Sequence, residues 1–85
     1  MPLKQTIGFL GAGKMATALA KGIVGAGLVR PSRIIASDIF PGARKAFAKE
    51  ISAKVTASNA EVFKKADVII LAVKPHQAEE VFASV

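Results

Sequence analysis

A glycine-rich hexapeptide constrains the fold of this chain more than any other feature of its sequence. Residues 11–16 read GAGKMA and match the pattern G-x-G-x-x-A. They follow a short apolar run at residues 6–10, which is typical of a buried strand. The residues after them carry small and apolar side chains at helical spacing. The sequence therefore predicts a strand that turns sharply into a helix.

Each small residue of the hexapeptide meets a separate physical requirement. Gly11 permits the tight turn, Gly13 lets a pyrophosphate approach the backbone, and Ala16 lets the helix lie close to the strand. Backbone N–H groups at the start of the helix favour an anion, and the charge of Lys14 adds to this attraction. We therefore predict that NAD or NADP binds here, with a purely structural turn as the alternative. A P-loop is disfavoured because G-x-x-x-x-G-K-[ST] is not present.

Strand and helix patterns alternate along the chain. The first helix is expected to end near Gly25 and Gly27. Pro41 and Gly42 are expected to break the chain before the second helix. The expected buried face of the first helix consists of Met15, Ala18, Leu19, Gly22, Ile23 and Ala26. Further strands are expected at residues 33–37, 54–56 and 67–73, and further helices at 43–51, 59–66 and 76–85.

The alternation predicts an α/β, Rossmann-like fold, in which helices cover both faces of a parallel sheet. The β-branched run at 67–73 is typical of a parallel strand covered on both faces. Ser58 and Glu61 have the spacing of a capping box at the start of the third helix. Because the chain stops within the last expected helix, we expect residues 1–85 to form the N-terminal part of a dinucleotide-binding domain.

An acidic residue ends the second expected strand. Asp38 follows the glycine motif at a spacing close to the offset of about 20 residues expected for a ribose-binding acid. Its carboxylate can accept hydrogen bonds from the 2′-OH of an adenosine ribose and would repel a 2′-phosphate, although Ser37 or Arg44 could soften that repulsion. The alternative is that Asp38 stabilises a turn or caps a helix, and that Arg44 is a solvated helix residue. Asp38 therefore predicts a preference for NAD(H), or at least a weakened preference for NADP(H).

Four segments together resemble the pyrroline-5-carboxylate reductase family. They are IGFLGAGKMA at residues 7–16, ASD at 36–38, SNAE at 58–61 and ADVIILAVKP at 66–75. The resemblance implies reduction of pyrroline-5-carboxylate to L-proline with NADPH or NADH, in proline biosynthesis. It implies cofactor contacts at Leu10, Gly11, Ala12, Gly13, Lys14, Met15, Asp38, Asn59, Ala72, Val73, Lys74 and Pro75. The family often has Ser, Thr or Asn in place of Asp38 in NADP-using members, so Asp38 departs from that pattern.

The resemblance also implies features outside residues 1–85. In the family, a second, helical domain supplies the substrate site and the dimer interface, so no catalytic residue is assigned here and the full-length protein is expected to be a homo-oligomer. His76, the single histidine, is expected to be a solvent-facing helix residue. The alternatives are a related reductase, of the deazaflavin:NADP or the imine or β-hydroxyacid type, and a regulatory module that senses NAD without catalysis.

Composition excludes several other classes of function. The chain has 12 Lys and Arg against 6 Asp and Glu, but the basic residues are dispersed and Tyr and Trp are absent, so nucleic acid is not expected as a partner. Cys is absent, which rules out a disulfide, a thiolate nucleophile and a cysteine metal site. The longest apolar run, residues 68–73, is too short to span a bilayer, and the N-terminus lacks the layout of a signal peptide. We expect a cytoplasmic protein without membrane partners.

Overall fold

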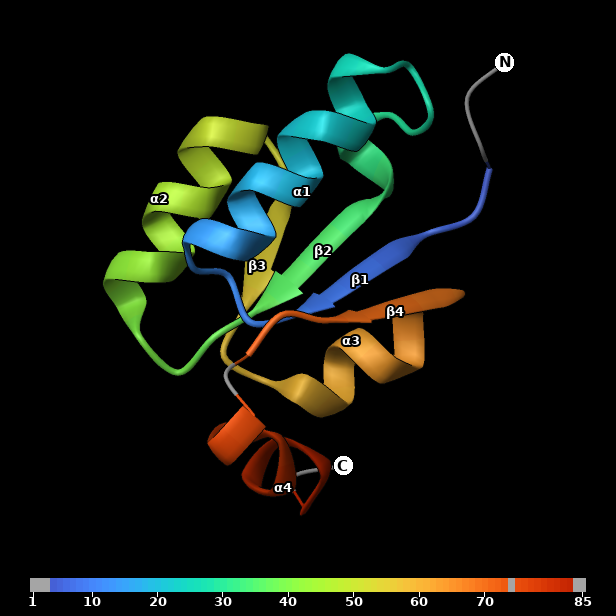
Figure 1. Ribbon diagram of the computed structural model, residues 1–85. Coiled ribbons are helices and arrows are strands. Elements are labelled where there is room, and N and C mark those ends of the chain that lie inside the picture. Colours follow the sequence, from blue (N-terminus) through green and yellow to red (C-terminus); the bar gives the residue numbers. More distant parts are fainter. Residues whose placement is uncertain (1–3, 74, 84–85) are drawn as a thin grey trace.

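Figure 1 shows a computed structural model of the chain, which describes residues 4–73 and 75–83. Strands and helices alternate as predicted, with one additional short 3-10 helix, η1. In chain order the elements are β1 (Ile7–Leu10), α1 (Lys14–Gly25), η1 (Pro31–Arg33), β2 (Ile34–Ser37), α2 (Pro41–Ile51), β3 (Lys54–Thr56), α3 (Asn59–Lys65), β4 (Val68–Leu71) and α4 (Pro75–Ala83). Arg33, expected to begin the second strand, therefore ends η1 instead.

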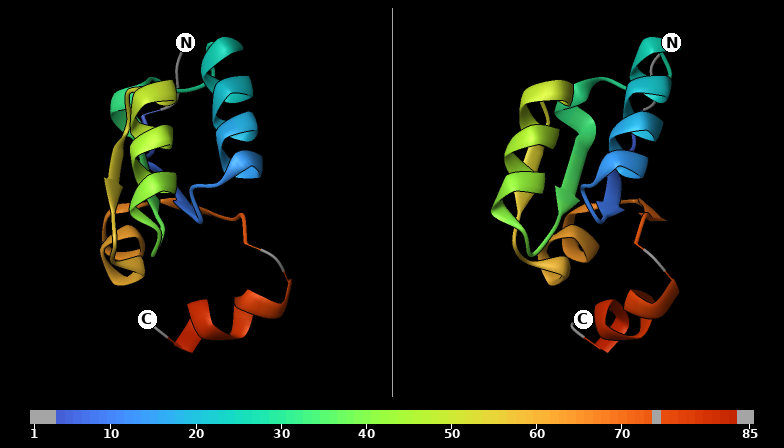
Figure 2. Two further views of the ribbon diagram at one scale, coloured as in Figure 1. Left: turned by 90° about the vertical axis from the view of Figure 1, so that its left-hand side faces the viewer. Right: turned by 60° about the vertical axis from the view of Figure 1, so that its left-hand side comes forward.

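The strands form one parallel sheet in the order β3-β2-β1-β4. In its register, Ile7 of β1 lies between Ile34 of β2 and Val68 of β4. Helices α1 and α2 lie on one face of the sheet and α3 lies on the other, while α4 lies beyond the carboxyl ends of the strands (Figures 1 and 2). This arrangement confirms the predicted Rossmann-like fold.

Two apolar clusters hold the helices against the sheet. In the larger cluster, on the side of α1 and α2, the rings of Phe9 and Phe47 have centroids 5.8 Å apart and are both fully buried. In the smaller cluster, on the side of α3, Val62 packs with Leu10 and Ile35. Gly8 permits this second contact, because a Cβ at Gly8 would lie 2.5 Å from Cγ1 of Val62.

The start of α3 confirms the predicted cap. Ser58 is the N-cap residue, and its hydroxyl accepts a hydrogen bond from the backbone N–H of Glu61 at 3.2 Å. A hydrogen bond with Thr56 and a hydrogen bond and ion pair with Lys65 hold the pKa of Glu61 below its ordinary value. These contacts fix the first turn of α3, which places Asn59 beside the end of β2.

The buried face of α1 agrees with the predicted one at Ile23, which packs against the larger cluster, and otherwise differs from it. Ala16 and Ala20 are fully buried, whereas Met15 and Leu19 are 54% and 45% exposed. Apolar residues occupy more than one stripe of this helix, so hydrophobicity does not select the stripe that faces the sheet. Close approach of the helix selects it, because an alanine methyl fits between helix and strand where a longer side chain does not.

Two further expectations are corrected. Pro41 and Gly42 do not break the chain but begin α2, because the first turn of a helix needs no N–H from proline. Strand β4 is covered only in part on each face, because Ile70 and Ile69 pack against the larger and the smaller cluster whereas Val68 and Leu71 are 43% and 40% exposed. No helix in the described ranges is long and apolar enough to cross a membrane.

Candidate cofactor-binding site

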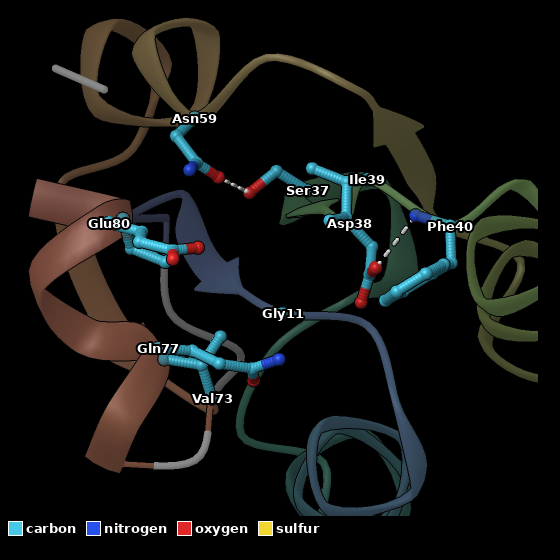
Figure 3. Close-up of a pocket in the computed structure, with 10 residues that line it drawn as sticks. Gly11, Ser37, Asp38, Ile39, Phe40, Asn59, Val73, Gln77 and Glu80 are labelled. Carbon is cyan, nitrogen blue, oxygen red and sulfur yellow. Dashed lines mark hydrogen bonds between the residues drawn. The ribbon is translucent and has the colours of Figure 1, made fainter. Parts of the chain in front are cut away.

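A pocket of about 260 Å³ lies where the carboxyl ends of β1, β2 and β4 meet α3 and α4. We call it the strand-end pocket, and Figure 3 shows its lining. It is lined by Gly11, Ser37, Asp38, Ile39, Phe40, Asn59, Val73, Gln77, Glu80 and Val81. Ligands of open parallel sheets bind at this edge, because the loops that leave the strands converge there. The fold thus brings Gly11, Ser37, Asp38, Asn59 and Val73 of the predicted set together.

A second hollow, the helix groove, runs between α1 and α2 and has a volume of about 530 Å³. Its lining includes three more of the predicted residues, Ala12, Gly13 and Lys14. Farther along the groove, the ammonium of Lys21 lies 2.7 Å from the carboxylate of Glu50, and this contact lowers the pKa of Glu50. The glycine turn therefore borders both hollows.

The fold itself requires a glycine at position 11. Its φ is +107°, a conformation that residues with a side chain rarely adopt. A Cβ at this position would lie 2.6 Å from the carbonyl oxygen of Ala72 and 3.0 Å from Cγ1 of Val73. Gly11 therefore lets the turn after β1 pass close to the segment that follows β4.

Gly13 is not required by the protein in this way. It precedes α1 with φ −80° and ψ −160°, which any residue can adopt, and a Cβ there would meet no heavy atom within 4 Å. The space above Gly13 is open, and the first-turn N–H groups of α1 lie next to it in the chain. Neither packing nor backbone conformation requires a glycine here, although glycine is a favourable N-cap residue for α1.

Asp38 is held rigidly at the edge of the strand-end pocket. One carboxylate oxygen accepts a hydrogen bond from the backbone N–H of Ala12 at 3.0 Å, and the other accepts one from the backbone N–H of Phe40 at 2.9 Å. The guanidinium of Arg44 donates to the backbone carbonyl of Asp38 at 2.7 Å. Asp38 thus stabilises two turns and also lines the pocket, so the two interpretations of its role are compatible.

Ser37 and Asn59 form a hydrogen-bonded polar pair in the same pocket. Ser37 is fully buried, and its hydroxyl donates a hydrogen bond to the side-chain oxygen of Asn59 (Figure 3). A hydroxyl has one proton to donate. While this hydrogen bond is present, Ser37 can offer only acceptor lone pairs to a ligand, which do not suit a phosphate oxygen.

Comparison with known proteins identifies the family. The sequence model of the family described as "NADP oxidoreductase coenzyme F420-dependent" matches residues 6–85. The chain belongs to this family. Its members' description agrees with the Rossmann-like sheet and with the glycine turn at the carboxyl end of β1.

Relatives within the curated proteins are named pyrroline-5-carboxylate reductase, which confirms the resemblance found in the sequence. The chain is 40% identical to the one from Methanosarcina acetivorans over 80 residues, which is 94% of the chain and 30% of the relative. It is 41% identical to the one from Glycine max over 76 residues, 89% of the chain and 28% of the relative. The chain thus spans less than a third of the length of these relatives.

Solved structures show the same fold. A pyrroline-5-carboxylate reductase from Coxiella burnetii superposes with a TM-score of 0.84 at 32% identity, over 93% of this chain and 29% of that one. A Plasmodium falciparum pyrroline carboxylate reductase with NADP bound gives a TM-score of 0.80 at 27% identity, over 99% of this chain and 29% of that one.

Of the remaining predicted residues, Leu10, Met15, Arg44 and Ala72 lie outside the lining of both hollows. The side chain of Leu10 is fully buried in the smaller cluster, so any contact with a cofactor must come from its backbone. Ala72 is nearly buried, and its N–H donates to the carbonyl of Leu10 at 2.9 Å. Met15 is exposed on α1, and Arg44 contacts Asp38 as described above. Lys74 lies outside the described residues, and Pro75 and His76 lie in the first turn of α4 with side chains outside those described.

Sequence reasoning missed five residues of the strand-end pocket. They are Ile39, Phe40, Gln77, Glu80 and Val81. Ile39 and Phe40 gave a readable signal, since two large apolar side chains between an acid and a proline have no evident core to join. They are in fact 72% and 59% exposed. The three α4 residues gave no signal in the sequence, because they line the pocket only as a result of where α4 lies beyond the carboxyl ends of the strands.

The described residues hold no group of three or more His, Cys, Asp or Glu side chains that could bind a metal ion. The polar groups that line the strand-end pocket are two carboxylates, two side-chain amides and one hydroxyl, a set that suits the recognition of a nucleoside.

Proposed function

We propose that this chain binds NAD(H) or NADP(H) across the glycine turn, as the cofactor-binding part of a pyrroline-5-carboxylate reductase. The observation that carries the proposal is the glycine turn at the carboxyl end of β1, where Gly13 is exposed and leaves the backbone at the start of α1 open to a ligand. Its context supports the proposal, since Gly11 of the turn lines the strand-end pocket, Gly13 lines the helix groove, and α1 begins directly after Gly13. The relatives' names supply the reaction, which is reduction of pyrroline-5-carboxylate to L-proline.

The residues of the site fit the parts of a dinucleotide. The first-turn N–H groups of α1 and the exposed backbone at Gly13 would hold the pyrophosphate, with Lys14 close by in the chain. The carboxylate of Asp38 would accept hydrogen bonds from the hydroxyls of the adenosine ribose. The exposed side chains of Ile39 and Phe40 would contact the adenine ring. When bound, the reduced cofactor supplies the hydride for reduction.

The substrate and the assembly belong to the same proposal. We infer that groups outside residues 1–85, in a helical domain, bind pyrroline-5-carboxylate and form the interface of a homo-oligomer. We also infer a cytoplasmic location and no nucleic-acid or membrane partner, in keeping with the dispersed basic residues.

A second candidate is an oxidoreductase that exchanges a hydride between NADP and a reduced deazaflavin, and the description of the matched family favours it. The two candidates share the cofactor and differ in the second substrate. Saturable binding of the deazaflavin to the full-length protein, measured by fluorescence in the presence of NADP, would support the second candidate, and we expect no such binding.

Direct titration tests the proposal. NAD+, NADH, NADP+ and NADPH are each added to the purified chain, and binding is followed by calorimetry or by nicotinamide fluorescence. We expect saturable binding of at least one pair. A chain that is folded by circular dichroism and binds none of the four at millimolar concentration would refute the proposal.

A further inference from the structure

One wall of the strand-end pocket comes from α4, and the wall facing it comes from the segment that follows β2. Gln77 and Glu80 line the pocket from α4, while Asp38 and Phe40 line it from the opposite side (Figure 3). The carboxylate of Glu80 is directed into the space between the two walls (Figure 3). The pocket therefore carries a second carboxylate that the proposed contacts with ribose and pyrophosphate do not use.

The position of Glu80 is set by the way α4 packs. Val81 packs against the apolar cluster of Leu10, Ile35 and Val62, which places this face of α4 towards the strand ends. Residues 77, 80 and 81 have the spacing i, i+3 and i+4, so they share one face of the helix. The neighbouring Glu79 is on another face and does not line the pocket.

The pocket offers apolar surface at one place and hydrogen-bond acceptors at others, an arrangement that suits a nucleoside. Ile39 and Phe40 offer apolar surface to the faces of a planar ring. Asp38, held by two backbone N–H groups, offers acceptors on the side of β2. Glu80 offers an acceptor from the far wall and, when ionised, has no proton to donate. A purine edge directed at Glu80 must therefore present a donor.

Adenine and the 6-oxo purines differ at such an edge. Adenine carries an amino group at C6, which donates hydrogen bonds, whereas guanine carries an oxygen there, which only accepts. Hypoxanthine likewise carries an oxygen at C6. At the edge that carries C6 and N7, a carboxylate attracts adenine and repels the other two bases. On the other side of C6 the N1–H of a 6-oxo purine would donate to the carboxylate, so Glu80 selects adenine only where it meets the C6–N7 edge.

We propose that Glu80 is a base-selecting residue, which favours adenine over 6-oxo purines in the cofactor by accepting a hydrogen bond from the 6-amino group. This inference rests on the proposed function, because it assumes that the adenosine half of the cofactor occupies the strand-end pocket. Glu80 is exposed in the absence of ligand, so solvent weakens its contribution. We expect it to provide a preference of about fivefold to tenfold, somewhat below the usual range for a hydrogen bond to a charged group.

The test compares NADH with reduced nicotinamide hypoxanthine dinucleotide, which differs from NADH only in the base. Both are titrated into the wild type, Glu80→Ala, Glu80→Gln and the matched control Glu79→Ala, at one ionic strength. Glu79→Ala removes the same charge from the same helix without altering the pocket. Circular dichroism confirms that each variant is folded.

We expect the wild type and Glu79→Ala to prefer NADH by the same factor, and Glu80→Ala to lose most of that preference through weaker NADH binding. Glu80→Gln should bind the hypoxanthine dinucleotide more tightly than the wild type does, because an amide can donate to the oxygen at C6. A structural role of Glu80 would not produce this gain. Equal preferences in the wild type and Glu80→Ala overturn the inference and leave the proposed function intact, whereas absence of binding by the wild type overturns both.

Discussion

The carboxylate of Asp38 accepts a hydrogen bond from the backbone N–H of Ala12, with 3.0 Å between Oδ2 and the nitrogen. This contact joins the end of β2 to the glycine turn that follows β1. The other carboxylate oxygen accepts from the backbone N–H of Phe40. Asp38 thus cannot turn away from the pocket without losing two hydrogen bonds, and its charge is fixed where the adenosine ribose is proposed to lie.

Replacing Asp38 with Ser should change the choice of cofactor. The substitution removes an acceptor for the 2′-OH and a charge that repels a 2′-phosphate, so NADPH should bind more tightly and NADH more weakly. The expected change in their relative affinity is about 1 to 2 kcal/mol, or roughly tenfold. Loss of the two hydrogen bonds should also lower the free energy of unfolding by about 1 to 2 kcal/mol.

The control for this substitution is Asp67→Ser. Asp67 also accepts a hydrogen bond from a backbone N–H, that of Thr6 at 2.8 Å. It precedes β4 and so lies at the amino ends of the strands, away from the strand-end pocket. It should lower stability without changing the preference between the cofactors. Strong NADPH preference in the wild type that Asp38→Ser leaves unchanged would contradict our interpretation of Asp38 and leave the fold untouched.

Gly13→Val should abolish cofactor binding and spare the fold. The added side chain meets no protein atom within 4 Å of its Cβ and the backbone is already extended, so the free energy of unfolding should fall by no more than about 1 kcal/mol, the cost of replacing a glycine N-cap. The same side chain fills the space in which the pyrophosphate must approach the backbone. Gly25→Val, at the far end of α1, also places its Cβ in open space and serves as the control. Equal binding by Gly13→Val and Gly25→Val would show that the turn is wrongly assigned.

Gly11→Ala should instead damage the fold. Its φ of +107° is unfavourable for alanine, and the new Cβ would lie 2.6 Å from the backbone oxygen of Ala72. Strain of this kind costs about 2 kcal/mol, which lowers the Tm of a domain of this size by on the order of 10 °C. Thermal unfolding followed by circular dichroism measures the change, and a Tm equal to that of the wild type would contradict it.

Phe40→Ser should weaken NADH and NADPH to the same extent, because the ring is proposed to contact the adenine that both share. Stacking of a base on an aromatic side chain contributes about 1 to 3 kcal/mol, so a loss of at least roughly fivefold is expected for each cofactor. Phe63→Ser is the control, since Phe63 is 39% exposed on α3 and does not line the pocket. A similar loss in both variants would assign the effect to general destabilisation.

The 85-residue chain should bind its cofactor without reducing pyrroline-5-carboxylate. None of its described residues forms a site for the substrate beside the proposed cofactor site, and hydride transfer is slow when the reacting groups are not held together. A spectrophotometric assay of NADPH and NADH oxidation with the substrate checks this. Turnover at an ordinary enzymatic rate would mean that the chain assembles a substrate site, for example by self-association.

Local sequence determined most of the elements. The apolar run of β1, the three residues of β3 and the capping serine of α3 lie where the sequence placed them, because strand periodicity and helix caps are set by neighbouring residues. The glycine turn was also predictable, because the motif G-x-G-x-x-A places glycine at position 11 for a tight turn and at position 13 for the approach of a ligand. The placement of Asp38 at the end of β2 followed from the strand pattern.

Tertiary structure decided which surfaces meet. The motif indicated that Ala16 lies against the strand, but helical periodicity did not show that α1 buries Ala20 rather than Met15 and Leu19, because only the close approach to the sheet distinguishes these faces. The sequence could not show that Glu80 shares a pocket with Asp38, since residues far apart in the chain become neighbours only when α4 packs through Val81. Helix periodicity and turns depend on neighbours in sequence, whereas a binding pocket depends on the positions of several elements at once.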